Sequence, residues 1–462
     1  MAFIKSISGF RGTIGGKPGN NLTPVDIVEC TSAFVAQLQE EYGTRDITIV
    51  LGRDGRVSGK HVSTLAAESI ISMGAKVIDC GLSTTPTVEM AVPYHNAQGG
   101  IIFTASHNPK EWNALKLLNR EGEFLSRELG ESVIQKAANR DFEFASIDVL
   151  GSFLADTEAI ERHVTEIIHD DLILEQKVRD LKYHVIVDCI NSTGAIAIPP
   201  LLEKLGCTYT LINEEVSGHF AHNPEPLAHH LTELSERVKA EKAQLGIAVD
   251  PDVDRLALVD EKGNYIGEEY TLVTVADYLS EFRSGTFVSN LSSSKALQDL
   301  VRQKGGSYAS AAVGEVNVVA KMKEQNAVLG GEGNGGIIYP PLHYGRDALL
   351  GIAMVLSLMA HRNKTISELR ASYPHYEMIK DKIALPQTMA TETILEQLAL
   401  RFSGFEKDTI DGLKIYIDTG WVHLRASNTE PILRLYAEAE TFENARKLAD
   451  KVKSAYDKIV HL

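Results

Sequence analysis

The chain has 462 residues, of which 44% are hydrophobic and 23% charged, as is typical of a globular protein with substantial cores. At roughly 150 residues per domain it is long enough for about three domains, with two or four also possible. The formal net charge of -16 excludes the basic surface that nucleic acid or anionic lipid requires, but not a phosphorylated small molecule, which needs only local positive charge.

Targeting and redox signals point to the cytoplasm. Residues 1–10 lack the long apolar segment of a signal peptide, and no stretch of 18 apolar residues predicts a membrane span. The four cysteines form no C-x-x-C motif, so we expect them to be small buried hydrophobic residues. We therefore expect a cytoplasmic protein with no nucleic-acid or membrane partner.

The first third of the chain alternates short apolar runs with amphipathic stretches. Residues 47–51 predict a buried strand, residues 62–73 a helix, and residues 75–80 and 100–103 two further strands. Strands alternating with helices predict a largely parallel sheet covered by helices.

The same rhythm restarts twice and then changes. A second unit runs from the apolar segment 183–188 to 246–249, and a third contains 286–290. The tail predicts three successive strands and a closing helix, at residues 413–417, 421–425, 432–437 and 443–459.

These patterns predict an α/β protein with three similar mixed α/β domains and a smaller C-terminal α+β domain. We place the domains at residues 1–150, 151–256, 257–371 and 372–462.

The segment Thr104–Pro109, with the sequence TASHNP, directly follows the predicted strand 100–103. Open α/β sheets bind ligands at the carboxyl ends of their strands, so Ser106 is placed to be a nucleophile or a phosphate carrier. Taken alone, the segment is explained at least as well by a turn whose polar side chains satisfy backbone groups.

The segment Asp250–Arg255, with the sequence DPDVDR, follows the strand 246–249. In an extended backbone, Asp250, Asp252 and Asp254 would face one side, and their repulsion would call for a cation. Oxygen ligands with open positions suit Mg²⁺, and Arg255 could hold a phosphoryl oxygen. A solvated turn is the plain alternative. An EF-hand is rejected, because Arg255 stands where that loop needs glycine and strands flank the segment.

Two further segments suggest recognition of a sugar and of an anion. Residues 330–336 contain G-x-G-x-x-G, but the extended sequence IIYPP follows instead of the helix that a dinucleotide site needs. Glu332 and Asn334 suit paired hydroxyls, although a flexible hairpin explains the segment equally well. The segment 425–431, RASNTEP, offers a guanidinium, hydroxyls and an amide to a phosphate, or is a hairpin turn with a surface arginine.

Together the four segments supply a hydroxyl, a metal site, sugar donors and a phosphate clamp from four different parts of the chain, which predicts a shared central cleft. In motif order, spacing and length the whole chain resembles the α-D-phosphohexomutase family, which includes phosphoglucomutase, phosphomannomutase and phosphoglucosamine mutase. The resemblance implies four domains around the cleft and a cytoplasmic isomerase acting on sugar phosphates, as a monomer or homodimer.

The resemblance also implies roles for individual residues. Ser106 would be the phosphoserine, and Mg²⁺ would be bound by the Ser106 phosphate with Asp250, Asp252 and Asp254. The catalytic set would add Arg11, His107, Lys116 and Arg255. Substrate would be bound by Gly314, Glu315, Glu332, Asn334, Arg425, Ser427, Asn428 and Thr429.

The implied reaction passes the phosphoryl group of Ser106 to a hexose 1-phosphate or 6-phosphate. The resulting hexose 1,6-bisphosphate, which also serves as activator, turns end for end and returns its other phosphate to Ser106. One departure concerns Gly335–Gly336, where family members commonly have Gly-His, with His343 as a nearby substitute. The glycine-rich segment with Gly335–Gly336, together with Gly345-Arg346-Asp347, resembles archaeal-type phosphoglucosamine mutases. That resemblance favours glucosamine phosphate over glucose or mannose phosphate. A metal-dependent phosphatase and a non-catalytic sugar-phosphate binding protein are the alternatives from other classes.

Overall fold

A computed structural model of the chain describes residues 3–7, 9–386, 389–427 and 432–460. It divides into two compact units, each formed from two separate parts of the chain. Unit one comprises residues 1–279 and 334–371, and unit two comprises residues 280–333 and 372–462.

Unit one begins with a seven-stranded mixed sheet in the order β1-β2-β6-β5-β3-β4-β7. Strands β5, β3, β4 and β7 are parallel, whereas β1, β2, β6 and β5 pair in antiparallel fashion. The strands are β1 (Phe3–Ser6), β2 (Gly9–Thr13), β3 (Thr48–Arg53), β4 (Lys76–Leu82), β5 (Gly99–Phe103), β6 (Trp112–Leu118) and β7 (Phe153–Ala155). The helices of this part are α1 (Pro24–Tyr42), α2 (Gly59–Ser72), α3 (Thr85–Tyr94) and α4 (Arg127–Asn139), with a 3-10 turn at Ile147–Val149.

The central strand β3 is buried on both faces, which explains its continuous apolar sequence. Ile49 and Leu51 belong to the core that includes α1 and α2, whereas Val50 belongs to the core that includes α3. Successive side chains of a strand alternate between faces, so one apolar run serves two cores. The carboxyl ends of β3 and β5 lead into the polar loops of the candidate site.

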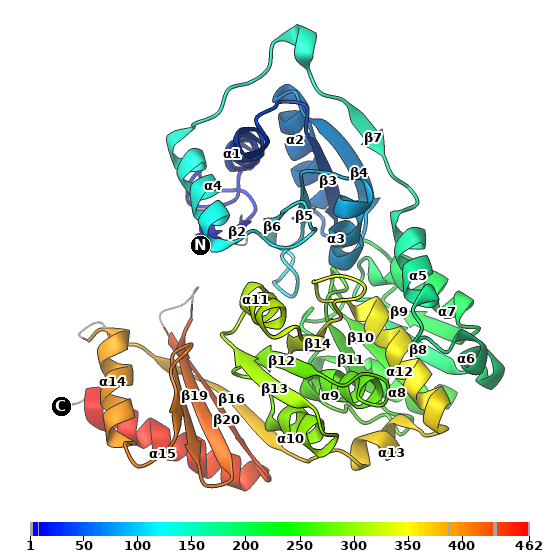
Figure 1. The fold of residues 1–462 in the computed structure, drawn as a ribbon, viewed down its shortest axis with the longest axis vertical. Coiled ribbons are helices and arrows are strands. Elements are labelled where there is room, and N and C mark those ends of the chain that lie inside the picture. Colours follow the sequence, from blue (N-terminus) through cyan, green and yellow to red (C-terminus); the bar gives the residue numbers. More distant parts are fainter. Residues whose placement is uncertain (1–2, 8, 387–388, 428–431, 461–462) are drawn as a thin grey trace. The chain divides into compact units, whose positions relative to one another are not determined.

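A second sheet of unit one has the order β11-β10-β8-β9, with only β11 antiparallel. Helix α12, the long yellow helix in Figure 1, contacts α5, α6, α7 and α9. The strands of this sheet are β8 (His184–Asp188), β9 (Thr208–Ile212), β10 (Leu245–Val249) and β11 (Leu256–Val259). Strand β15 (Gly336–Ile338), which follows the segment of unit two, is not part of this sheet. The helices are α5 (Ala159–His169), α6 (Glu175–Leu181), α7 (Gly194–Lys204), α8 (Thr232–Glu241), α9 (Glu268–Leu279), α12 (Ala348–Arg362) and α13 (Ile366–Ala371), with a 3-10 turn at Ala228–His230.

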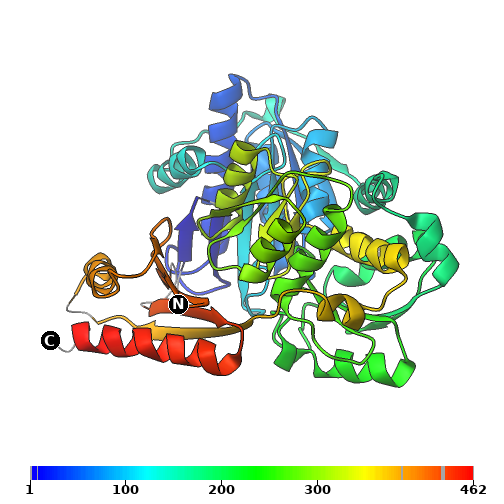
Figure 2. The same ribbon diagram turned by 60° about the horizontal axis from the view of Figure 1, so that its bottom comes forward.

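Unit two contains the parallel strands β13, β12 and β14 and a separate antiparallel sheet in the order β16-β20-β19-β18-β17. Figure 2 shows α15 running along the antiparallel sheet, where it contacts β16, β19 and β20. The strands are β12 (Thr286–Asn290), β13 (Ser307–Ala311), β14 (Leu329–Glu332), β16 (Glu377–Ala384), β17 (Lys407–Asp408), β18 (Leu413–Ile417), β19 (Gly420–Ala426) and β20 (Ile432–Ala439). The helices are α10 (Lys295–Gln303), α11 (Glu315–Gln325), α14 (Thr391–Arg401) and α15 (Phe442–Val460).

The mixed α/β sheets and the antiparallel C-terminal sheet with its packed helices confirm the predicted fold class. All four cysteines are buried and free, as expected of small hydrophobic residues. Within the described parts of the chain, no helix is both long and apolar enough to cross a bilayer. The four domain boundaries and the central cleft stay predictions.

Candidate active site

Ser106 lies in a strained turn at the carboxyl end of β5. Its backbone has a φ of +48°, in the left-handed region that non-glycine residues rarely occupy. The Ser106 N–H donates to the Thr104 hydroxyl at 2.9 Å, and the side chain is buried. Such a conformation costs about 1–3 kcal/mol and persists only where neighbouring groups fix it.

Arg56 provides that support. Its guanidinium is fully buried beside Asp54, with Nε 2.9 Å from Asp54 Oδ2, and Asp54 also accepts the Thr104 hydroxyl at 2.7 Å. The same guanidinium donates to the backbone carbonyls of Ser106, Asn108, Pro109 and Trp112. The sequence prediction missed Arg56, although a polar run at the end of a buried strand, 52–56, was a signal for it.

The three aspartates converge through a turn, so the predicted extended backbone was wrong. Val253 has a φ of +60°, which is rare for a β-branched residue, and its N–H donates to the Asp250 carbonyl at 3.1 Å. Asp250 Oδ1 accepts the N–H groups of Asp254 at 3.2 Å and Arg255 at 3.1 Å. Antiparallel strands β10 and β11 flank the turn, which agrees with rejection of an EF-hand.

The structure brings this turn to Ser106. The Ser106 hydroxyl donates to Asp250 Oδ2 at 2.5 Å. One oxygen from each of Asp250, Asp252 and Asp254 lies within 4.8 Å of the others, and all three residues are fully buried. Burial, followed by the charges of Asp254 and Asp252, raises the pKa of Asp250 well above its usual value. The predicted carrier and metal ligands therefore form one cluster.

The donor set fits a divalent cation. Asp252 Oδ1 and Asp254 Oδ1 are buried and have no hydrogen-bond partner among the described residues. An unpaired buried carboxylate oxygen carries a large desolvation cost, which a bound cation would offset. Oxygen ligands of this kind are those that Mg²⁺ prefers.

Three cationic side chains surround the aspartates. Lys116 Nζ lies 2.7 Å from Asp252 Oδ2, and Arg346 Nη2 lies 2.6 Å from Asp254 Oδ2. Arg255 Nε is 3.9 Å from Asp250 and 3.8 Å from Asp254. Burial lowers the pKa of Lys116, but Asp252 and Asp254 outweigh it, so this pKa is raised overall.

Arg11 and His107 complete the predicted catalytic set around Ser106. Arg11 Nη1 donates to Asn108 Oδ1 at 3.0 Å, and His107 Nδ1 lies 3.5 Å from the Ser106 hydroxyl. The charge of Arg255, then burial and the charge of Arg11, lower the pKa of His107 well below its usual value. His107 is therefore neutral at physiological pH in this arrangement.

In unit two the structure brings Gly314 and Glu332 together. Glu332 Oε1 accepts the Gly314 N–H at 3.1 Å and the Asn290 side-chain amide at 2.9 Å. Glu315 lies in the first turn of α11, directly after Gly314. Asn334 belongs to unit one, where its Oδ1 accepts the Gly336 N–H at 3.2 Å. Strand β15 follows the glycine-rich segment, so the dinucleotide motif is excluded as predicted.

The predicted phosphate clamp is described only in part, because Asn428 and Thr429 lie outside the described residues. Arg425 on β19 stands directly across from Arg434 on β20. Facing cations repel, which favours an anion beside them. The Ser427 N–H donates to the Ile432 carbonyl at 3.0 Å and so closes this end of the hairpin.

Asp411 links the two recognition segments of unit two and was missed by the sequence prediction. Its Oδ2 lies 3.3 Å from Arg425 Nε and accepts the Val313 N–H at 3.0 Å. The carboxylate therefore connects the arginine of the predicted phosphate clamp to the loop that contains Gly314. A single aspartate in a surface turn gives no sequence signal for this role.

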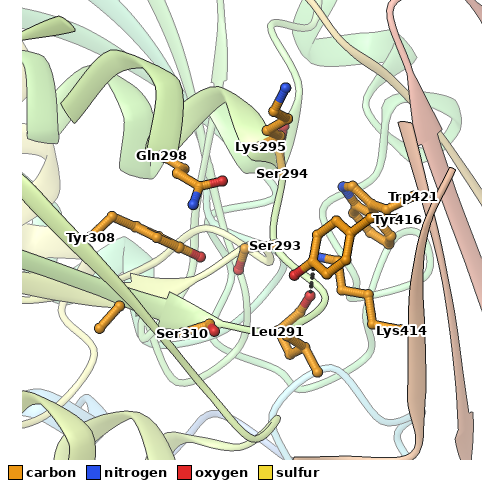
Figure 3. Close-up of a pocket in the computed structure, with 11 residues that line it drawn as sticks. Leu291, Ser293, Ser294, Lys295, Gln298, Tyr308, Ser310, Lys414, Tyr416 and Trp421 are labelled. Carbon is orange, nitrogen blue, oxygen red and sulfur yellow. Dashed lines mark hydrogen bonds between the residues drawn. The ribbon is translucent and has the colours of Figure 1, made fainter. Parts of the chain in front are cut away.

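A polar cavity of about 230 Å³ also lies in unit two (Figure 3). Lys414 donates from Nζ to the Leu291 carbonyl at 2.7 Å and lies 3.9 Å from the centre of the Trp421 ring. Ser293 of the cavity wall also accepts the Gly333 N–H at 3.1 Å, so the cavity adjoins the predicted sugar-binding segment. Its lining contains none of the residues predicted from the sequence.

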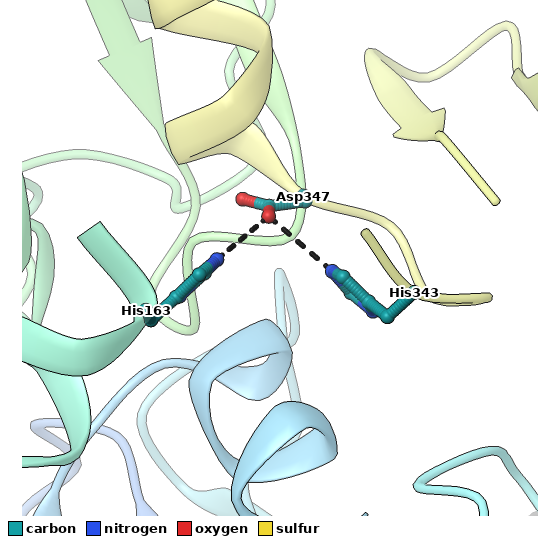
Figure 4. Close-up of side chains that lie close together, drawn as sticks. All are labelled: His163, His343 and Asp347. Carbon is teal, nitrogen blue, oxygen red and sulfur yellow. Dashed lines mark hydrogen bonds and ion pairs between the residues drawn. The ribbon is translucent and has the colours of Figure 1, made fainter. Parts of the chain in front are cut away.

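His343 belongs to a network of side chains at the start of α12, and its role as a substitute for the missing histidine stays a prediction. His163 Nε2 donates to Asp347 Oδ2 at 2.8 Å, and His343 Nε2 lies 3.3 Å from the same oxygen (Figure 4). His343 Nδ1 lies 3.4 Å from Glu89 Oε2. Asp347 Oδ1 also caps α12 by accepting the Leu350 N–H at 3.1 Å. This network holds the start of α12 in place.

Comparison with known proteins decides the family. Four models of the phosphoglucomutase/phosphomannomutase domains match in sequence: alpha/beta/alpha domain I at residues 4–144, domain II at 161–263, domain III at 267–376 and the C-terminal domain at 382–455. The chain belongs to the phosphoglucomutase/phosphomannomutase family.

Relatives of this mutase align over nearly their whole length. A phosphoglucomutase/phosphomannomutase of Thermococcus kodakarensis is 36% identical and covers 94% of this chain and 96% of its own. A probable phosphoglucosamine mutase of Methanopyrus kandleri is 33% identical, with 96% of both chains covered. The crystal structure of a family protein from Burkholderia thailandensis has a TM-score of 0.83 at 25% identity and covers 99% of this chain and 98% of its own. This protein is thus a phosphohexomutase, an isomerase, with a three-aspartate site suited to the metal of a metal-dependent mutase.

Proposed function

We propose that this mutase interconverts glucosamine 6-phosphate and glucosamine 1-phosphate through phosphorylated Ser106. A hexose 1,6-bisphosphate is the intermediate and the activator. The observation that carries the proposal is the 2.5 Å contact between the Ser106 hydroxyl and Asp250, inside a buried cluster of carboxylates and cations. Phosphoryl transfer depends mainly on positioning and charge neutralisation, and this cluster supplies both.

In this proposal Asp250, Asp252, Asp254 and the phosphate on Ser106 hold Mg²⁺. When bound, the ion would neutralise the carboxylates and the phosphoryl oxygens. Arg11 and Arg255 stabilise the remaining negative charge, because both are held near the Ser106 turn. The strained turn, held by Arg56, fixes the direction of the Ser106 oxygen.

Lys116 exchanges a proton with the sugar hydroxyl that gains or loses the phosphoryl group. Asp252 and Asp254 raise its pKa against the effect of burial, so it holds its proton while those charges are unopposed. Once they are neutralised, Lys116 can accept the proton of the attacking hydroxyl, a contribution of about 10²–10⁴-fold for such groups in general. His107 is neutral and orients the Ser106 oxygen.

Unit two and Asn334 recognise the rest of the substrate. Glu332, Glu315 and the Gly314 backbone bind the sugar hydroxyls, and the segment from Arg425 through Ser427, Asn428 and Thr429 binds the phosphate that is not being transferred. The link from Asp411 to both segments supports a joint response to substrate. Because the clamp must accept either end of the bisphosphate, it binds a phosphate rather than a particular ring carbon.

The alternative substrates are glucose and mannose phosphates, favoured by the 36% identity to a phosphoglucomutase/phosphomannomutase. Turnover is compared with glucosamine, glucose and mannose phosphates, each primed by its 1,6-bisphosphate. We expect kcat/KM for glucosamine phosphate to be at least about tenfold the others, or about 1.4 kcal/mol of discrimination. An equal or higher value with glucose or mannose phosphate would reassign the substrate.

Replacement of the carrier tests the mechanism. Ser106→Ala should lower mutase turnover at least about 10³-fold, because no other group can carry the phosphate, and should leave sugar-phosphate binding in place. The exposed Ser146→Ala is the control. Phosphorylation at residue 106 is checked by mass spectrometry of the purified enzyme. Undiminished turnover excludes Ser106 as carrier, whereas release of free phosphate in place of isomerisation would identify a phosphatase.

A further inference from the structure

Arg346 lies beside the metal-binding aspartates but was not among the predicted site residues. Its guanidinium is buried and lies 2.6 Å from Asp254 Oδ2, the oxygen that Lys116 Nζ approaches to 3.6 Å. Asp254 therefore has two cationic neighbours at one oxygen, while its other oxygen has no hydrogen-bond partner among the described residues.

The position of Arg346 depends on the absence of a side chain at Gly336. A Cβ placed on Gly336 would lie 2.3 Å from Arg346 Cδ and 2.9 Å from Cγ. Gly335 has a φ of +87° and needs glycine for its backbone, but no positive φ is recorded for Gly336. The second glycine is therefore required for space, and that space holds the arginine.

The backbone of Arg346 is fixed on both sides. Arg346 forms an antiparallel bridge with Ile338, and the next N–H, of Asp347, donates to the Ile337 carbonyl at 2.9 Å. Asp347 is in turn held by His163 and by the N-terminal turn of α12 (Figure 4). These contacts fix the point from which the Arg346 side chain extends to Asp254.

The charge of Arg346 reaches the Ser106 turn as well as Asp254. Asp254, which Arg346 contacts, has a carboxylate oxygen within 4.8 Å of one on Asp250, and Asp250 accepts the Ser106 hydroxyl at 2.5 Å. The charge of Arg346 also contributes, behind burial, Arg255 and Arg56, to lowering the pKa of Arg11. Arg346 is therefore one of a group of cations whose mutual repulsion an incoming phosphate would relieve.

We propose that Arg346 is a positioning residue of the phosphoryl-transfer site, which holds Asp254 and balances its charge while adding to the positive field at Ser106. The proposal rests on the proposed function of this site. Arginine keeps its proton at physiological pH, so this role is electrostatic and proton exchange is left to Lys116.

The proposal predicts opposite effects on two ligands. Without Arg346 the aspartates are more negative, so a divalent cation should bind more tightly, and an anion beside Ser106 should bind more weakly. A side chain with a merely structural role would weaken both when removed, because the site would lose its shape.

The experiment uses the full-length, dephosphorylated enzyme freed of metal. Titration calorimetry measures the Kd of Mn²⁺ alone and of inorganic phosphate alone. For Arg346→Met we expect the Mn²⁺ Kd to fall at least about threefold and the phosphate Kd to rise at least about threefold. Gly336→Ala should change the two Kd values in the same directions as Arg346→Met does, but by smaller factors, because its Cβ displaces the arginine. Exposed Arg127→Met is the control, and Arg346→Lys should lie closer to wild type than Arg346→Met does.

Weaker binding of both ligands by Arg346→Met, or no change in either, overturns the proposal. A thermal unfolding scan of each variant establishes that it is folded before binding is measured. The binding experiment does not measure turnover. A wild-type protein without mutase activity would refute the proposed function, but the Kd values would still decide the role of Arg346.

Discussion

Ser106 and Val253 both adopt left-handed backbone conformations, one in each of the two turns that meet at the candidate site. Conformations of this kind store about 1–3 kcal/mol each and need support from their surroundings. Arg56 supports the first turn through backbone carbonyls, and Asp250 supports the second through backbone N–H groups. At the residue scale, the site is built from side chains that hold main-chain shape as much as from those that do chemistry.

Arg56→Met tests the support of the Ser106 turn. It leaves Asp54 buried without its cation, which typically costs about 3–5 kcal/mol. Burial already raises the pKa of Asp54, and the loss of Arg56 raises it further, so Asp54 of the folded variant takes up a proton as pH falls. The loss of unfolding free energy relative to wild type should therefore be smaller at pH 5 than at pH 8. Urea unfolding at both pH values measures the difference.

The matched control is Arg45→Met, which breaks an exposed ion pair with Glu143 at 3.5 Å and should cost less than about 1 kcal/mol. Equal costs for the two variants would contradict a supporting role for Arg56.

At the element scale, α12 organises much of unit one. Its N-terminus is capped by Asp347, its body packs on α5, α6, α7 and α9, and the Ala348 N–H that opens it donates to the Val253 carbonyl at 3.2 Å. The helix therefore fixes the aspartate turn from one side and Arg346 from the other. Its cap depends on the charges of His343 and Asp347.

Stability should fall with rising pH because of His343. Burial alone would lower the pKa of His343, but Asp347 and Glu89 outweigh it and raise this pKa to about 10. The ordinary value in an unfolded chain is about 6.5, so the protonated histidine stabilises the fold fully below about pH 6.5, and this contribution is lost as pH rises toward about pH 10.

The measurement is the difference in unfolding free energy between wild type and His343→Gln. We expect this difference to shrink by about 1 kcal/mol per pH unit between pH 7 and pH 9.5. Exposed His375→Gln is the control, because its contact with Glu377 lies at the surface. A difference that does not vary with pH would show that His343 is neutral in the folded protein.

At the scale of the whole molecule, the residues proposed for phosphoryl transfer and most of those proposed for recognition belong to different units. Ser106, the aspartates, Lys116 and Arg346 lie in unit one, whereas Gly314, Glu332 and Arg425 lie in unit two. The three aspartates proposed to bind the metal all lie in unit one, so we expect metal binding to act on the stability of that unit without substrate.

Metal addition tests this separation. Mg²⁺ at about 100 times its Kd should stabilise the unit that binds it by about 2.7 kcal/mol. In hydrogen exchange, the amides of Asp254 and Arg255 should gain protection, and those of β19 and β20 should not. The change should reverse with a chelator and be absent in Asp252→Asn. Equal protection in β19 and β20 would show that the metal acts on both units.

The sequence by itself determined the fold class and the main chemical groups, because strand and helix periodicity, the serine loop and the aspartate motif are local patterns. It anticipated that Ser106 and the aspartates act together, and their hydrogen bond agrees.

Only the tertiary structure decided how the turns are held. The aspartates meet through a left-handed Val253 rather than an extended strand. Arg56, Arg346 and Asp411 each contact a residue 50 or more positions away in the chain. His343, near Gly336 in sequence, contacts Glu89, a residue more than 200 positions away that no local pattern connects with it. Contacts between distant segments depend on packing and on available space, such as the volume left by Gly336. Local sequence patterns predict neither of these.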